Sequence, residues 1–347
     1  MRKLLMVGTA LVAVSLAMPA FAKTETTFEV SLAAALAGNS GNVAGNSASV
    51  ESQSTSASIS NNSYGGTKGV SNTNQNAGAN SALQNALAIS YIQGCGCATG
   101  GYTVAAGGAL AAAGNGGEVE HSTSTSRQEI TGYTYVRKPW VKDGDDRDDF
   151  FKVPTWGADN YVTASIAGSF NNATGVFQVN QNAGDNSLLQ NAASVAAATS
   201  LKGNELDAGA AIALAGNSGE VERNGASADH THASASMTGS FNGDTGIVSA
   251  NQNAGADSQL QNSAAVASLP FCGCAENNLS LSVAAAGNEG GVYGNTASAE
   301  NGSNGASMNN SFVGSTGVMS ANQNAGANSL LQNSVAVGVI THTAPGS

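Results

Sequence analysis

The sequence predicts an all-β fold: a repetitive β-solenoid, or amyloid-like stacked cross-β, with short strands and Asn/Gln ladders. The main observation is a phrase, Asn-Gln-Asn-Ala-Gly, that occurs four times, starting at Asn74, Asn180, Asn251 and Asn322. Counted along the chain, the first interval between these starts is 106 and the next two are both 71. A fixed period indicates one structural unit that is copied and stacked, because a single unit of this kind cannot bury a core alone.

Composition is the second observation. Charged residues make up 10% of the chain and aromatic residues 5%, while there are 44 glycines. Such a chain lacks the bulky side chains of an ordinary globular core and the charge and proline of a typical disordered one. Small side chains still pack densely where sheets approach closely, as they do in cross-β stacks with dry interfaces.

Strict alternation of residue types is the third observation. Serine occupies every second position from Ser52 to Ser60, which is the period of a strand with two distinct faces. Asn-Gly and Thr-Gly pairs, as in the segment 240–247, are turn signals. The alanine runs 33–37 and 109–113 could be helical by propensity. Their flanking glycines and their equal placement in each unit favour strands.

A second phrase, Ala-Gly-Asn, precedes each copy of the first and has its Asn at 39, 115, 217 and 288. We therefore divide the chain into a leader, 1–22, and four repeat units, 23–98, 99–201, 202–274 and 275–347. The repeat period sets the length of each unit, apart from an insertion in the second. The two phrases lie roughly 35 residues apart, so we expect each half-unit to form one layer of a stack.

The first 22 residues have the form of an export signal. Arg2 and Lys3 form its basic start, 4–18 its apolar stretch, and Ala20-Phe21-Ala22 its cleavage site. About 15 apolar residues are fewer than the ~20 that span a bilayer, so we expect cleavage, secretion to the cell surface or exterior, and no embedded membrane segment. Without Arg2 and Lys3, 10 of the 12 basic residues remain against 23 acidic ones, a net charge of −13. This charge argues against nucleic acid and anionic membranes as partners.

The stacking of identical units predicts where assembly contacts lie. Side-chain amides placed above one another at the ~4.8 Å strand spacing hydrogen-bond along the ladder, and Leu83, Leu189, Leu260 and Leu331 would form an apolar row beside them. The predicted ladder residues are Asn74, Gln75, Asn80, Gln84, Asn180, Gln181, Asn186, Gln190, Asn251, Gln252, Gln261, Asn322, Gln323, Asn328 and Gln332.

The insertion in unit 2 lies roughly between His121 and Tyr161. It contains both tryptophans, Trp140 and Trp156, and the densest charge, at 142–149. Its composition differs from that of the repeats, so we expect it to loop out of the stack. The acidic run could bind Ca²⁺ through carboxylate oxygens, but its spacing is not that of an EF-hand, and a solvated loop is favoured.

Few residues could carry other chemistry. The four cysteines form two Cys-Gly-Cys pairs at equivalent positions, Cys95/Cys97 and Cys272/Cys274. Disulfides of unknown connectivity are favoured outside the cytoplasm, and metal binding by four thiolates is the alternative. His230 and His232 would share a strand face and could chelate a metal, although a solvated face is favoured. We assign no catalytic residue, no cofactor and no metal, and expect a non-enzyme.

The repeats resemble those of the Fap-type fibril subunits among secreted bacterial functional amyloids. The segments 168–176 and 239–247 match the family phrase Gly-Ser-Phe-Asn-Gly-x-x-Gly-Ile/Val, although Cys-Gly-Cys stands where the family has Cys-x-x-Cys. Curlins are a looser match, because their Gln-x4-Asn spacing is broken where Gln252 meets Asp257.

The resemblance covers the mature chain outside the insertion. It implies a self-assembling subunit of an extracellular fibre in a biofilm matrix or cell coat, served by an outer-membrane export pore and a minor nucleator subunit. The alternative from the sequence is a soluble β-solenoid adhesin whose binding module is the insertion.

Overall fold

The computed structural model describes residues 26–51, 53–60, 63–92, 102–139, 150–198, 206–271 and 277–342. All the regular secondary structure in this part of the chain is β-strand, which confirms the all-β prediction. The expected leader and the acidic run of the insertion lie outside the described residues. The unit boundaries at 98, 201 and 274 lie outside them too, so the division into units remains our proposal.

The predicted disulfides also fall outside the described part of the chain. The first cysteine pair follows a described segment that ends at residue 92, and the second follows one that ends at residue 271. Neither disulfide bonding nor the alternative of metal binding by thiolates is therefore tested, and both stay predictions. The residues concerned are Cys95, Cys97, Cys272 and Cys274.

The strands fall into four sets that follow the chain. The first is β1 (Thr26–Ser40), β2 (Val43–Ala44), β3 (Ser47–Glu51), β4 (Ser54–Ile59), β5 (Lys68–Asn76) and β6 (Ala82–Ile92). The second is β7 (Tyr102–Gly116), β8 (Glu118–Glu120), β9 (Thr123–Arg127), β10 (Ile130–Arg137), β11 (Phe150–Trp156), β12 (Asn160–Ala167), β13 (Thr174–Asn182) and β14 (Leu188–Ala198).

The third set is β15 (Leu206–Glu222), β16 (Gly225–Asp229), β17 (Thr231–Thr238), β18 (Thr245–Asn253) and β19 (Gln259–Phe271). The fourth is β20 (Asn277–Tyr293), β21 (Thr296–Glu300), β22 (Ser303–Asn309), β23 (Thr316–Asn324) and β24 (Leu330–His342). Except for β10 and β11, each set lies in one layer of a four-layer stack.

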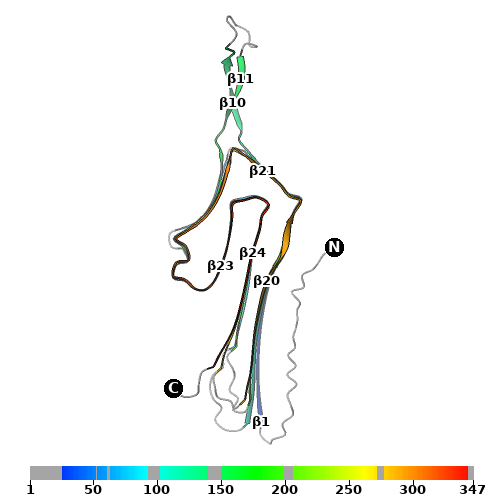
Figure 1. Ribbon diagram of the computed structural model, residues 1–347, viewed down its shortest axis with the longest axis vertical. Coiled ribbons are helices and arrows are strands. Elements are labelled where there is room, and N and C mark those ends of the chain that lie inside the picture. The colour runs from blue at the N-terminus through cyan, green and yellow to red at the C-terminus, as the bar shows by residue number, and fades with distance from the viewer. Residues whose placement is uncertain are drawn as a thin grey trace.

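Equivalent strands of successive layers pair in parallel and in register. One sheet, for example, has the order β23-β18-β13-β5, and it pairs Asn322 with Asn251, Asn251 with Asn180, and Asn180 with Asn74. Figure 1 looks along the stack, so that equivalent strands overlap. Stacked partners are separated by a whole period, so each layer is a whole unit and the expectation that half-units form separate layers is wrong. The two phrases of a unit lie in different strands of one layer because turns return the chain beside itself.

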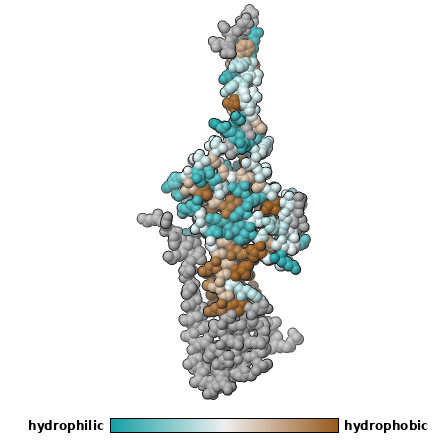
Figure 2. Space-filling model, turned by 180° about the vertical axis from the view of Figure 1, so that it is seen from behind, coloured by the Kyte–Doolittle hydropathy of each residue, from teal (hydrophilic) through white to brown (hydrophobic). Residues whose placement is uncertain are grey.

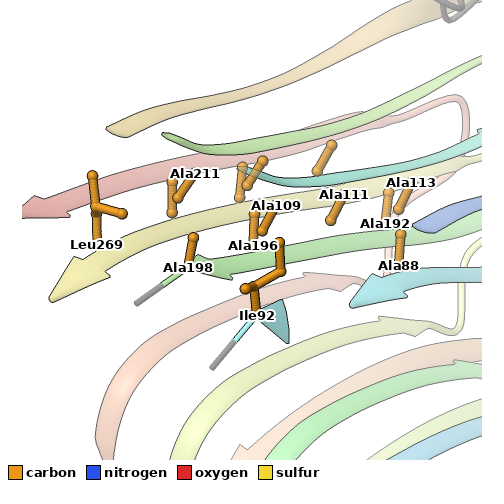
Figure 3. Close-up of a cluster of buried hydrophobic side chains, with 14 of the residues drawn as sticks. Ala88, Ile92, Ala109, Ala111, Ala113, Ala192, Ala196, Ala198, Ala211 and Leu269 are labelled. Carbon is orange, nitrogen blue, oxygen red and sulfur yellow. The ribbon is translucent and has the colours of Figure 1, made fainter. Parts of the chain in front are cut away.

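Within a layer the chain folds back and forth, so that β14 is covered on both faces. On one face, the hydroxyl of Ser194 donates to the carbonyl oxygen of Ala111 in β7 at 2.6 Å. On the other, the amide of Asn191 donates to the carbonyl oxygen of Val179 in β13 at 3.0 Å. The long strands β7 and β15 meet β14 and β19 through alanines (Figure 3). Methyl groups let the sheets approach closely, which is why the alanine runs are strands here.

The insertion forms an antiparallel hairpin. Strand β10 pairs with β11, from Ile130–Trp156 to Arg137–Phe150, and the pair extends away from the layers in Figure 1. The register locates it, because Ser126 pairs with Ala228, which is 102 positions further along the chain, whereas Asn160 pairs with Thr231, which is 71 positions further along. The extra chain is therefore residues 128–158, between β9 and β12.

Some positions require glycine in every layer. Gly69, Gly175, Gly246 and Gly317 form one column near the start of β5 and its equivalents, with φ of 118°, 142°, 131° and 117°. A Cβ on Gly246 would overlap the carbonyl oxygen of Gly175 in the layer beneath. The column therefore lets strands approach to the ladder spacing where any side chain would keep them apart.

We expect Gly246→Ala to disrupt the stack by more than the ~1 kcal/mol that a positive φ alone costs, because backbone cannot move aside as a flexible side chain can. The matched control is Gly305→Ala in β22, where a Cβ would meet nothing within 4 Å. Denaturant unfolding followed by circular dichroism checks this. Equal loss of stability in the two variants would contradict the steric role of the column.

Candidate assembly surface

The central feature of the stack is a column of asparagines in β5, β13, β18 and β23. The side-chain amide of Asn180 donates to Oδ1 of Asn74 at 3.1 Å, that of Asn251 to Asn180 at 3.1 Å, and that of Asn322 to Asn251 at 3.2 Å. The same amides reach sideways, since Nδ2 of Asn251 also lies 2.9 Å from the carbonyl oxygen of Gln190. One side chain thus joins two layers and two facing sheets.

Three further columns repeat this pattern. Glutamines donate down one column, Gln332 to Gln261 at 2.9 Å, Gln261 to Gln190 at 2.8 Å and Gln190 to Gln84 at 2.8 Å. Two columns that the sequence interpretation did not include are asparagines. Their members are Asn76, Asn182, Asn253 and Asn324, and Asn85, Asn191, Asn262 and Asn333. Asn333 pairs with Asn262 in register, but its amide donates to Oδ1 of Asn322 at 2.7 Å. They recur with the same period as the predicted columns, which is the signal that could have found them.

The direction of donation differs between columns. In the columns of Asn180 and Gln190, each layer donates to the layer before it. In the column of the second phrase the order reverses: Asn39 donates to Asn115 at 3.0 Å, Asn115 to Asn217 at 2.8 Å, and Asn217 to Asn288 at 2.9 Å. The two ends of the stack therefore differ chemically, and each presents both donors and acceptors.

Two of the predicted columns have partners other than their own kind. Gln75, Gln181 and Gln252 each donate to a serine carbonyl oxygen of the next layer, at 3.1–3.2 Å, so they join β5, β13 and β18 to the sheet of β12. Gln323 is their counterpart in β23. Asn80, Asn186 and Asn328 lie in the turns after these strands, with φ of 51°, 51° and 53°, a left-handed conformation that asparagine tolerates.

An aromatic column, absent from the sequence interpretation, runs through the turns before these strands. Tyr64, Phe170, Phe241 and Phe312 stack with ring centroids 4.6, 4.7 and 5.1 Å apart and nearly parallel planes. Phe170 and Phe241 are fully buried. The leucine row lies in register, with Leu189 paired to Leu83 and Leu260, and Leu260 to Leu331. Aromatic and aliphatic columns thus flank the amide columns.

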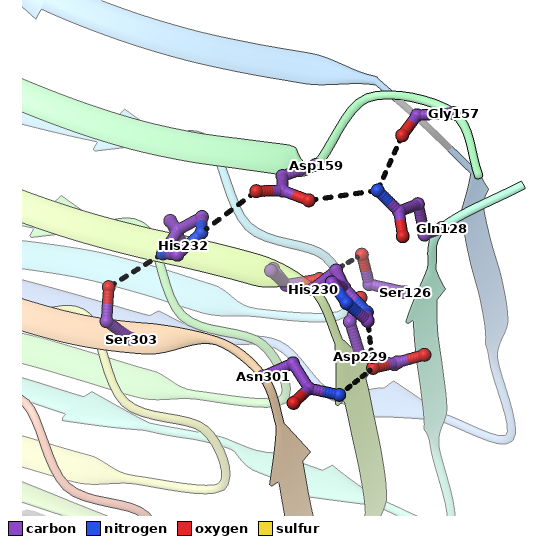
Figure 4. Close-up of polar contacts among 10 residues, drawn as sticks. Ser126, Gln128, Gly157, Asp159, Asp229, His230, His232, Asn301 and Ser303 are labelled. Atoms are coloured by element: carbon purple, nitrogen blue, oxygen red, sulfur yellow. Dashed lines mark hydrogen bonds and ion pairs between the residues drawn. The ribbon is translucent and has the colours of Figure 1, made fainter. Parts of the chain in front are cut away.

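A polar cluster holds the root of the hairpin (Figure 4). The amide of Gln128 donates to Oδ1 of Asp159 at 3.0 Å, and Nε2 of His232 lies 3.4 Å from Oδ2 of the same carboxylate. His230 lies between β16 and β17 with φ of 50° and pairs instead with Asp229. The two histidines therefore have separate partners. In the described residues no group of three or more His, Cys, Asp or Glu could hold a metal ion.

Both ends of the stack are open. In the glutamine column, Gln190 and Gln261 are fully buried, whereas Gln332 in the fourth layer is exposed. In the asparagine column, Asn180 and Asn251 are fully buried, whereas Asn74 in the first layer is exposed. Figure 2, seen from the side of the first layer, shows polar side chains gathered over the middle of the molecule and apolar ones below them. These unpaired strands and half-finished columns form what we call the end surfaces: the faces of the first layer (β1–β6) and the fourth layer (β20–β24).

A parallel, in-register stack with amide and aromatic columns and open ends defines the class of amyloid-like β-stack proteins. The model of the functional amyloid protein FapB/FapC family matches residues 13–198 and 145–340. The two matches together span most of the chain, which therefore belongs to this family. No curated protein and no solved structure matches it. Among the described residues, no helix has the length and apolar character needed to cross a membrane.

We expect Asn251→Ala to cost about 2–4 kcal/mol, because it leaves several buried acceptors, among them Oδ1 of Asn180 and the carbonyl oxygen of Gln190, without their donor. Denaturant unfolding measures the loss. The control is Asn309→Ala in the exposed end of β22, which should change stability by less than about 0.5 kcal/mol. A small loss of stability in both variants would mean that the amide columns contribute little to the free energy of unfolding.

Proposed function

We propose that the chain is the structural subunit of an extracellular amyloid-like fibre, in a biofilm matrix or cell coat, and that it polymerises by adding layers end to end. The observation that carries this proposal is the pair of open end surfaces on a stack of nearly identical layers. An unpaired sheet edge is a template for another strand. The family membership supports the proposal, and so does the sequence of residues 1–22, which has the form of an export signal. An export pore and a nucleator subunit are further partners that we infer from the family resemblance.

The reversed directions of the columns support head-to-tail growth. Gln332 continues a column in which each Oε1 accepts from the layer above, and Gln84 begins that column with its Nε2 as donor. In the column of the second phrase, which donates in the opposite direction, Asn288 offers Nδ2 and Asn39 offers Oδ1. When the first layer of one copy lies on the fourth layer of another, Gln84 can donate to Gln332 and Asn288 can donate to Asn39. Two fourth layers face to face would set acceptor against acceptor.

The purified mature chain should form fibres that bind amyloid dyes and resist detergent. Replacing Gln190, Gln261 and Gln332 with Glu should slow assembly at neutral pH by at least about tenfold, since carboxylates would lie ~4.8 Å apart in a buried column.

The matched control places three carboxylates in an exposed column, at Thr125, Ser227 and Ser298, where water and salt screen them. Dye-binding kinetics and electron microscopy provide the measurements. A wild-type chain that stays monomeric at high concentration for days would refute the fibre proposal.

The hairpin favours a second function, adhesion by a module that the stack displays. Strands β10 and β11 pair with each other alone among the described strands, and a two-stranded hairpin is marginally stable by itself in water. Four aromatic side chains on it are 43–58% exposed, those of Tyr133, Tyr135, Phe151 and Trp156. Nζ of Lys152 lies 3.6 Å from the ring centroid of Tyr133. Clustered aromatic and cationic side chains of this kind favour a binding surface.

Deleting residues 128–158 should bring the whole second layer to the period that the third and fourth layers share, with Arg127 followed by Asp159 as Asp229 is followed by His230 in the third layer. We expect the deletion variant to fold and to form fibres at a rate within about threefold of wild type, because no layer strand is lost. Binding to cells or matrix polymers is what should decrease. A variant that cannot fold would show that the hairpin is part of the core.

A further inference from the structure

One column of turn residues contains a single departure from asparagine. Asn80, Asn186, Asp257 and Asn328 occupy the same left-handed position, with φ of 51°, 51°, 54° and 53°. In the first two layers the side chain makes a defined contact, since Nδ2 of Asn80 donates to the carbonyl oxygen of Thr123 at 2.8 Å. Likewise, Nδ2 of Asn186 donates to that of Gly225 at 3.0 Å. Each amide thereby fastens a turn to the next layer.

Asp257 has no N–H with which to make this contact. The strand register pairs Gly225 with Thr296, so the equivalent acceptor for Asp257 is the carbonyl oxygen of Thr296. Asp257 is 0% exposed, and among the described residues neither of its carboxylate oxygens has a donor at hydrogen-bonding geometry, although the Asn186 amide lies near enough to lower its pKa. Oδ1 of Asn186, in the layer beneath, also lacks a donor. A carboxylate is thus buried where an N–H donor belongs.

In the described part of the chain, the surroundings offer Asp257 no compensating positive charge. The ionisable side chains of the elements around its turn are Asp185 in the turn beneath, Asp229 at the far end of β16 and Glu300 at the far end of β21, and all three are acidic. The carboxylate of Asp185 is occupied, because it accepts from the N–H of Ala79 at 2.6 Å and from the hydroxyl of Ser124 at 2.7 Å.

A buried carboxylate without a donor or a cation is costly unless it becomes neutral. A protonated carboxyl group carries an O–H, which donates where the amide donates in the first two layers. A hydrated cation would need space beside Asp257. The cavity of about 450 Å³ that runs past this turn is lined by Asp185, and Asp257 is not part of its lining. Its position gives water access to the neighbouring turn without making room for an ion at Asp257.

We propose that Asp257 is a proton-binding site. When the fourth layer closes over the third, the Asp257 carboxylate takes up one proton from solvent, and the resulting O–H donates to the carbonyl oxygen of Thr296. The site lies within one chain, so proton uptake accompanies folding of the stack whether or not fibres form. Only an effect of this proton uptake on fibre growth rests on the proposed function.

The direction of the pKa shift agrees with the geometry. Burial raises the pKa of Asp257 to about 6 from 3.8, with the nearby Asn186 amide opposing the rise and the Asp185 charge adding to it. Because the folded carboxyl has the higher pKa, the stabilisation is complete below about pH 3.8 and is lost as the pH rises through about 6. Burial also raises the pKa of Asp185 and of Asp244, so a slope of the same sign persists in any Asp257 variant.

The test compares the full mature chain with Asp257→Asn, which restores the residue of the other three layers. Denaturant midpoints, converted to unfolding constants, are measured from about pH 4 to pH 8. Relative to Asp257→Asn, the wild type should lose up to about a hundredfold in folding constant across this range, since a shift of one pKa unit corresponds to tenfold. Glu300→Gln, which removes one exposed acid from β21, should keep the wild-type profile.

Infrared spectra of the folded chain with ¹³C-labelled aspartate provide a direct readout. A carboxylic-acid C=O band should be present at about pH 5, disappear towards about pH 8, and be weaker in Asp257→Asn. Parallel stability profiles for wild type and Asp257→Asn, or a carboxylate at Asp257 at about pH 5, would overturn the proposal. Failure to form fibres at any pH would refute the proposed function alone, because the stability profile and the infrared band do not require fibres.

Discussion

In-register parallel stacking is the constraint on which the rest of the structure depends. It places every side chain of a layer about 4.8 Å from its equivalent in the next, so each residue must tolerate a copy of itself above and below. Amides satisfy one another, aromatic rings stack, and methyl groups pack. Stacked charges repel, as in the carboxylates of Glu118 and Glu220, which are adjacent in register. The pKa of Glu118 is raised, first by burial and then by nearby glutamates, Glu220 among them. This constraint accounts for a chain with few charges.

Amides do more than connect layers. Asn180 and Asn191 lie in facing strands, and Nδ2 of Asn191 donates to Oδ1 of Asn180 at 2.9 Å. Their equivalents Asn251 and Asn262 repeat this bond at 2.9 Å. Two asparagine columns therefore form one connected network, which runs both along the axis and between two sheets. Such networks rigidify a core when every member is satisfied. The buried polar residues of β13 and β14 consequently replace the bulky apolar core that the composition cannot supply.

The sequence was sufficient to predict the all-β class and the strand nature of the alanine runs, because a repeat period and an alternation of residue types report directly on stacking. It was not sufficient to predict partners. Gln75 and Gln84 both recur in each unit, yet Gln190 donates to Gln84 of its own column whereas Gln75 donates to the carbonyl oxygen of Ser165. That difference depends on which strand faces each glutamine, and therefore on how the layer folds back. Recurrence identifies a column, but the path of the chain within a layer determines its bonds.

Departures from exact repetition show where the constraint is relaxed. Arg127 lies above Glu51 in register, and the two side chains form an ion pair at the edge of the stack. Here opposite charges occupy one column, and both side chains remain partly exposed, so neither incurs a full desolvation cost. The insertion at 128–158 is tolerated for a related reason. It leaves and re-enters its layer between β9 and β12, two short strands at the edge, so the strands that pair with them in the third layer, β16 and β17, keep their register. At such edge positions a residue is tolerated without a copy in the adjoining layer. Buried columns vary as well: Phe177 pairs with Val248 and Gln178 with Ser249, all fully buried, and Asp257 introduces a carboxyl group into a column of asparagines.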